Sequence, residues 1–247
     1  MIELTVALPL FNANRIAWLA LESLCNQKNI DFNWELIICE EDNQNRTTDL
    51  IDYVDRLKDV KCVKITYIPI AHKILLAKKW QVIGNTANSN SKVFVLQAGD
   101  CYSSPNRLSQ AYQKIAEEDF DWIDTTQGLF YSFISRKLFK YSSNALTNLD
   151  MSFKTEYARN IPETTLTSGI DRFLFKNCEN KKADYLKIFH NTKLHINRLD
   201  THGCNNISIH RETYFKSKPH IFKNVGYNLS KLDLPKPVIS KLLKIVV

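Results

Sequence analysis

The sequence lacks several features that would each point to a particular class of protein. No apolar run approaches the length of a membrane-spanning helix, and no secretory signal is expected before the strand that follows Met1. The six cysteines form no CxxC pair, and several lie inside apolar runs, which favours buried reduced thiols over a disulfide framework or a zinc site. There are no internal repeats and no low-complexity segments. We therefore expect a globular, cytoplasmic protein.

The net charge of +7 is not evenly spread along the chain. Residues 216–247 contain seven lysines and a single acidic residue, so the first 215 residues are nearly neutral. A protein that binds duplex nucleic acid usually spreads lysine and arginine over a folded face, and we expect no nucleic-acid partner. The apolar and basic segment 234–247 has two interpretations. It lies on an anionic membrane, or, as we favour, it packs on the domain with its lysines in solvent.

Apolar runs of strand length alternate with helical patterns in residues 1–119, and this alternation predicts an α/β protein with a mostly parallel sheet. Beyond residue 120 the alternation fades. We interpret residues 120–215 as a lobe that completes a site with the first half, and residues 216–247 as a basic tail of the same domain. The predicted strands are 4–8, 34–39, 62–68 and 93–96, and the predicted helices are 16–24, 50–57, 74–85 and 108–117.

Three of the predicted strands end in polar turns. The first ends in Leu8-Pro9-Leu10-Phe11-Asn12, the second in Glu40-Glu41-Asp42 and the fourth in Gln97-Ala98-Gly99-Asp100, with Pro105 following. In open α/β sheets, ligands bind at the carboxyl ends of the strands. These turns are therefore expected to form one binding edge.

Together, the turns resemble those of the inverting glycosyltransferases of family two, which have the GT-A fold. In that family the first strand ends in a P-x-Y-N-like turn, the second in a D-D-G-S-like turn and the fourth in a D-x-D motif. The resemblance covers residues 3–110 well, and Thr167-Ser168-Gly169-Ile170-Asp171 looks like the stretch that carries the catalytic base. It implies a GT-A fold (the nucleotide-diphospho-sugar transferase fold): a mostly parallel central sheet flanked by helices, with a smaller C-terminal acceptor lobe.

The resemblance also implies roles for individual residues. A nucleotide sugar presents a base and a ribose, which want carboxylate acceptors, and a diphosphate, which wants a hard cation with oxygen ligands. Glu40 would contact the base, and Glu41 the base or ribose. Asp100 would hold Mn²⁺ or Mg²⁺, with His202 as a further metal ligand or phosphate contact. The remaining donor-contacting residues would be Pro9, Phe11, Asn12, Gln97, Ala98 and Gly99.

Each of these residues also has a plainer interpretation. Glu40 suits a solvated acidic turn, Asp100 a turn or helix cap, and His202 an ordinary loop position. Lys78, Lys79 and Trp80 lie where the family often contacts the donor, but a solvated basic helix end is the favoured account. Ala98 takes the place of the family's first D-x-D aspartate, which puts metal dependence in question.

Asp171 is the candidate general base. Inverting transfer needs one carboxylate that removes the proton of the acceptor hydroxyl as its oxygen attacks the anomeric carbon. Asp171 also suits the first turn of a helix, where the helix dipole favours an acid, and the two roles are compatible.

We therefore expect a glycosyltransferase that moves a sugar from a UDP- or dTDP-linked donor to a sugar, glycan or glycoconjugate acceptor, with inversion. One alternative is a nucleotidyltransferase on a similar sheet, but such enzymes usually carry a glycine-rich loop after the first strand, and residues 9–15 contain no glycine. A second alternative is a catalytically weak nucleotide-sugar-binding module, for which Ala98 is the best argument.

Overall fold

The computed structural model describes residues 1–10, 16–41, 50–132, 137–166, 170–181, 188–191, 222–226, 229 and 234–244. The site predictions for Phe11, Asn12 and His202 therefore lie outside the described residues. No helix in the described ranges is long and apolar enough to cross a membrane.

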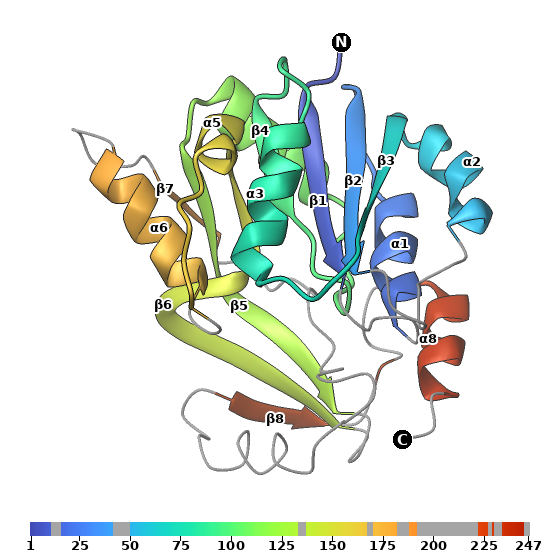
Figure 1. Ribbon diagram of the computed structural model, residues 1–247. Coiled ribbons are helices and arrows are strands. Elements are labelled where there is room, and N and C mark those ends of the chain that lie inside the picture. Colours follow the sequence, from blue (N-terminus) through green and yellow to red (C-terminus); the bar gives the residue numbers. More distant parts are fainter. Residues whose placement is uncertain are drawn as a thin grey trace.

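A parallel sheet forms the first half of the molecule (Figure 1). Its strands run in the order β3-β2-β1-β4. Continuous apolar runs, buried on both faces, explain why β1, β2 and β4 form strands inside the protein. The four strands are β1 (Leu4–Leu10), β2 (Trp34–Glu41), β3 (Cys62–Ile70) and β4 (Val93–Leu96).

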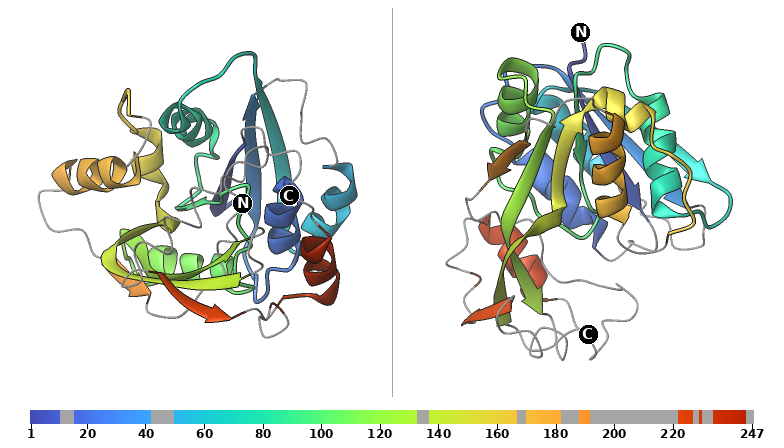
Figure 2. Two further views of the ribbon diagram at one scale, coloured as in Figure 1. Left: turned by 90° about the horizontal axis from the view of Figure 1, so that it is seen from below. Right: turned by 90° about the vertical axis from the view of Figure 1, so that its left-hand side faces the viewer.

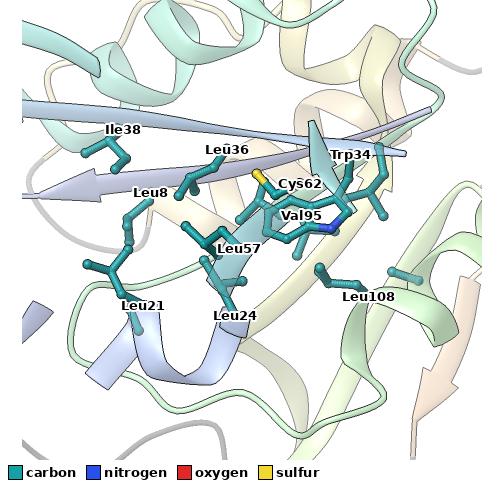
Figure 3. Packing of buried hydrophobic residues seen from close by; sticks show 14 of the residues in the cluster. Leu8, Leu21, Leu24, Trp34, Leu36, Ile38, Leu57, Cys62, Val95 and Leu108 are labelled. Carbon is teal, nitrogen blue, oxygen red and sulfur yellow. The ribbon is translucent and has the colours of Figure 1, made fainter. Parts of the chain in front are cut away.

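Helices cover both faces of this sheet. On one face, α1 (Ala17–Cys25), α2 (Ile51–Asp59) and α4 (Arg107–Tyr112) enclose a core to which Leu8, Leu36 and Val95 contribute (Figure 3). On the other face, α3 (Leu76–Thr86) packs on Ala7, Ile37 and Phe94. Because side chains alternate across a strand, neighbouring residues of β1 and β2 supply the two cores. A π-helical turn, η1 (Gln113–Glu117), continues α4.

The second half extends the same sheet, but with antiparallel pairs. The long strand β6 (Lys137–Lys154) runs antiparallel to β4, with Phe94 opposite Phe153, and also pairs with β5 (Trp122–Ser132). Figure 2 shows the β5–β6 hairpin curving away from the parallel strands. Outside the hairpin, β7 (Ile188–Asn191) pairs with β5 and β8 (Phe222–Gly226) with β6. The second half is thus continuous with the first.

Two helices of the second half, α5 (Thr155–Arg159) and α6 (Ile170–Lys181), join the core on the α3 side. The helices α3 and α5 approach closely at Gly84. A Cβ atom at this position would lie 2.3 Å from the carbonyl oxygen of Ala158, so only glycine allows the contact without a shift.

The C-terminal helix α8 (Lys236–Leu243) packs against the first half of the molecule. Its buried residues Val238 and Leu242 belong to a cluster that includes Leu19 of α1, and the Lys241 ammonium lies 4.2 Å from the ring centre of Trp18. This arrangement supports the expected packing for α8 of the tail, because Val238 and Leu242 are buried in this cluster.

Candidate functional site

The carboxyl ends of β1, β2 and β4 meet at one edge, as the sequence predicts. Leu10 is paired with Glu40 across β1 and β2. Beyond the last residue of β4, the Gln97 N–H donates to the Ala7 carbonyl over 2.9 Å, so the turn at residues 98–100 leaves the sheet beside β1. The structure therefore brings Pro9, Glu40 and the Asp100 turn to the same edge.

Glu40 is a buried carboxylate, not a solvated one. Glu40 is only 2% exposed. The Tyr67 hydroxyl of β3 donates to Glu40 Oε2 over 3.0 Å. Tyr67 was not anticipated from the sequence, because its pairing with Glu40 depends on the register between β2 and β3. The hydrogen bond fixes the direction of the carboxylate at the end of its strand.

Glu41 and Lys79 form a buried ion pair next to Glu40. The Lys79 ammonium lies 3.0 Å from Glu41 Oε1 and donates to the Leu10 carbonyl over 2.6 Å. The same Glu41 oxygen accepts the Ile74 N–H over 3.2 Å. Lys79 therefore connects the end of β1, the end of β2 and the loop before α3.

The expectation of a solvated helix end at residues 78–80 is wrong for two of the three residues. Lys79 and Trp80 are 2% and 4% exposed, whereas Lys78 is exposed. The sequence contained a signal for Lys79, which precedes Ile83 by four positions and so falls on the buried stripe of α3. A lysine on an apolar stripe requires a buried partner, and Glu41 supplies it.

A second buried network shapes the turn that carries Asp100. Arg107 Nη1 donates to Gln97 Oε1 over 2.9 Å, and Arg107 Nη2 donates to the Leu96 carbonyl. Gln97 Nε2 in turn donates to the carbonyls of Ala98 and Cys101 over 3.0 and 3.1 Å. Gln97 is 1% exposed, and this geometry favours a role in holding the turn, while a direct donor contact stays a prediction.

Ala98, Gly99 and Asp100 are only partly buried. The Cys101 thiol donates to Asp100 Oδ1 over 3.5 Å. Within the described ranges no group of three His, Cys, Asp or Glu side chains is arranged to hold a metal ion. A single carboxylate nevertheless fits a cation that is shared with a diphosphate, because Mg²⁺ is commonly held by one or two carboxylates together with substrate phosphates.

Cys39, at the end of β2, can be excluded as a nucleophile. Burial raises the pKa of its thiol to about 11, so the sulfur stays protonated near neutral pH. The five described cysteines are all free thiols: Cys25, Cys39, Cys62, Cys101 and Cys178.

Asp171 is the second residue of α6, and this helix begins on the side of the molecule where β1 and β2 end (Figure 1). The preceding segment runs along α3, where Gln81 Nε2 donates to the Ile161 carbonyl over 2.9 Å. Ile170 then joins the core cluster that contains Ala77 of α3. The backbone thus places Asp171 on the same side of the molecule as the ends of β1 and β2, and its role as a catalytic base stays a prediction.

Comparison with known proteins identifies the fold. No protein-family model matches the sequence. Chondroitin synthase of Escherichia coli is 23% identical over 168 residues, which is 64% of this chain but only 23% of that protein. The chain therefore spans about a quarter of the length of this curated relative.

Solved structures of glycosyltransferases superpose over 98% of the chain. A mannosyltransferase from Pyrobaculum calidifontis, PcManGT, in complex with GDP-Man and Mn²⁺, has a TM-score of 0.59 at 11% identity and is covered over 68% of its length. S. aureus TarS 1–349, in complex with UDP-GlcNAc, has a TM-score of 0.58 at 15% identity and is covered over 70%. A longer TarS chain gives a TM-score of 0.58 with 43% of its length covered. The chain has the α/β GT-A fold of glycosyltransferases, and the fold implied by the sequence is confirmed.

Proposed function

We propose that this protein is an inverting glycosyltransferase that uses a nucleotide-sugar donor. The observation that carries the proposal is the convergence of Pro9, Glu40 and Asp100 at one edge of a GT-A sheet. The likeness to PcManGT, TarS and chondroitin synthase supports the same class of reaction.

The donor would lie along the edge with its base toward Glu40. UDP-GlcNAc in TarS and GDP-Man in PcManGT make a nucleotide sugar the natural candidate, and we favour a UDP- or dTDP-linked one. Pro9, Phe11 and Asn12 would contact the nucleoside from the first turn, with Glu41 on the base or ribose. Ala98, Gly99 and Gln97 would line the path of the diphosphate.

In the chemical step, the acceptor hydroxyl oxygen attacks the anomeric carbon from the face opposite the nucleotide. The bond from that carbon to the diphosphate oxygen breaks, and the nucleoside diphosphate leaves. Asp171 would take the hydroxyl proton, which is the role of a general base. Mn²⁺ or Mg²⁺, held by Asp100 with His202 as a further ligand, would neutralise the leaving diphosphate.

The proposal extends to the acceptor and the compartment. The acceptor would be a sugar, glycan or glycoconjugate, in keeping with the chemistry of the similar proteins. A reducing, cytoplasmic setting is supported by the free thiols of the described cysteines. Contact with an anionic membrane through the exposed lysines of α8 would be peripheral.

The experiment is a titration of UDP-, dTDP- and GDP-sugars with Mn²⁺ or with excess EDTA, followed by thermal shift and by nucleoside diphosphate release. A ligand that binds only the folded state raises its melting temperature. Glu40→Gln replaces a charged acceptor with a neutral one, and donor binding should weaken about tenfold. Glu35→Gln is the matched control, because Glu35 is equally buried on the same strand but at its opposite end.

The possible results distinguish the role of Glu40 from the glycosyltransferase function as a whole. Stabilisation and turnover by a donor, weakened in Glu40→Gln but not in Glu35→Gln, supports the proposal. Equal donor affinity in both variants removes Glu40 from the site. If no nucleotide sugar binds wild-type protein, the glycosyltransferase proposal is wrong.

A catalytically weak binding module is the second candidate, and Ala98 favours it because it leaves Asp100 as the carboxylate of the turn. Nucleotide-sugar binding without turnover, across the whole donor panel and with mixed glycan acceptors, would select this candidate.

A further inference from the structure

A pocket of about 670 Å³ opens between the first turns of α3 and the segment at residues 162–165. Its volume falls within the range of ligand sites in proteins, about 300–1,000 Å³. Apolar atoms come from Ile74, Leu75 and Pro162, and polar groups from Gln81, Thr164 and Thr165. Lys73, Lys78 and Glu163 add charged groups. Of the lining residues only Lys78 lies where the family often contacts the donor, and in this structure it pairs with Glu163.

The two walls of the pocket are joined by hydrogen bonds. Gln81 Nε2 donates to the Ile161 carbonyl over 2.9 Å, which holds the second wall against α3. The Lys78 ammonium donates to Gln81 Oε1 over 2.7 Å and lies 3.2 Å from Glu163. The pocket is therefore a built feature, since contacts from both sides set the distance between its walls.

The pocket lies between the proposed donor edge and the chain segment that leads to Asp171. On one side, the Ile74 N–H donates to Glu41, so the pocket begins where the donor edge ends. On the other side, Thr165 precedes Asp171 by six residues, a distance of at most about 20 Å along an extended chain. The pocket also includes Ala77, which shares a core cluster with Ile170.

The lining has the chemistry that a sugar ring needs. The faces of a pyranose ring carry C–H groups, which pack on apolar atoms, whereas its rim carries hydroxyls, which need hydrogen-bond partners. Ile74, Leu75 and Pro162 suit the faces, and Thr164, Thr165 and Gln81 suit the rim. The nucleotide is already assigned to the ends of β1, β2 and β4, which leaves this pocket for the second substrate.

We propose that this pocket binds the acceptor saccharide and presents its hydroxyl toward Asp171. The inference rests on the proposed glycosyltransferase function and assigns its second substrate to a site of its own. The wall that precedes α6 would act in specificity, because it contacts the acceptor ring and is connected through the chain to the base.

The test fills the pocket from an exposed position. Thr165→Trp places an indole in the lining, and Thr165 is exposed, so the fold should tolerate the change. Leu166→Trp is the matched control, because Leu166 is the next residue, is 42% exposed and does not line the pocket. The probes are methyl β-glycosides of glucose, galactose, mannose, N-acetylglucosamine, N-acetylgalactosamine and glucuronic acid.

Two measurements are made on each protein. Saturation-transfer NMR without donor reports glycoside binding alone. Nucleoside diphosphate release from a donor, with and without the bound glycoside, reports transfer to the acceptor against hydrolysis by water. The expected result is glycoside binding and acceleration in wild type and Leu166→Trp, both reduced at least about tenfold in Thr165→Trp, with hydrolysis by water unchanged.

Three results would overturn the assignment: wild-type glycoside binding in Thr165→Trp, no binding of any glycoside to wild type, or loss of donor binding in Thr165→Trp. The last result would place the donor in the pocket. Failure of the proposed function is distinguishable from these results, because it appears as a lack of nucleotide-sugar binding. Glycoside binding is measured without donor and is therefore still tested in that case.

Discussion

The two halves of the sheet hold their functional groups in different ways. At the ends of the parallel strands, buried side chains pair with one another, as in the Lys79–Glu41 pair and the Gln97–Arg107 hydrogen bond. Between α3 and the segment at 161–166, the ion pair is instead formed by exposed side chains, with Lys78 48% and Glu163 83% exposed. The proposed donor edge is therefore preorganised, whereas the proposed acceptor side is held by contacts that water screens.

The largest expected effect tests this difference with two adjacent lysines. Lys79→Met removes the ammonium and leaves the Glu41 carboxylate buried without its ion-pair partner, and breaking a buried pair in this way costs about 3–5 kcal/mol. Lys78→Met removes an exposed pair, which is worth at most about 1 kcal/mol. The measurement is the free energy of unfolding from urea denaturation of both variants.

A similar loss of stability in the two variants would contradict the difference between the buried and the exposed ion pair. A double variant provides a further test. Lys79→Met combined with Glu41→Leu replaces the ion pair by an apolar contact and should recover much of the lost stability. Donor affinity should not recover in the double variant if Glu41 contacts the base or ribose, which separates its role in binding from its role in folding.

The next effect concerns catalysis and the start of α6. Asp171→Asn keeps the shape and polarity of the side chain but removes its basicity, so transfer should fall about a hundredfold or more while donor binding stays nearly constant. Glu179→Gln is the control, because it removes an acid from the exposed far end of the same helix. Turnover, donor affinity and melting temperature are measured for both variants.

If Asp171 is only a helix-terminus acid, the change costs at most about 1 kcal/mol of stability and turnover is retained. Wild-type turnover in Asp171→Asn would thus assign the base to another carboxylate, with Glu163 and Asp150 the next to substitute. Glu163 lines the proposed acceptor pocket and is therefore tested first.

The same contrast between the halves explains how far the sequence predicts the fold. The strand β4 lies at 93–96 as expected, because a short, continuous apolar run that is buried on both faces has few alternatives. The long strand β6 was not predicted, since it pairs antiparallel with β4 through contacts such as Phe94 opposite Phe153. Such a partner lies 59 residues away along the chain, and no local pattern specifies it.

The candidate site follows the same rule. Glu40 and Asp100 were placed at one edge because strand ends of a parallel sheet meet there, whatever the details of the side chains. Tyr67, which binds Glu40, and Arg107, which holds the turn of Asp100, were missed because their roles depend on burial and register. Lys79, which pairs with Glu41, was assigned to a solvated helix end for the same reason. The spacing of Arg107 and Ala111 on one helix face, like that of Lys79 and Ile83, marks positions where a charge faces the core.

The smallest effect tests where the end of the chain belongs. The helix α8 comes last in the sequence but packs on α1 of the first half, with the Lys241 ammonium over the Trp18 ring. Lys241→Gln removes this cation–π contact, and at an exposed position the loss should be about 0.5–1 kcal/mol. Lys244→Gln removes an exposed lysine at the end of the same helix and should change the free energy of unfolding by less.

Both variants lose one positive charge, so their binding to anionic vesicles should fall equally if the tail contacts a membrane only through its net charge. A loss of vesicle binding without any loss of stability in Lys241→Gln would instead show that this lysine faces a membrane and not Trp18.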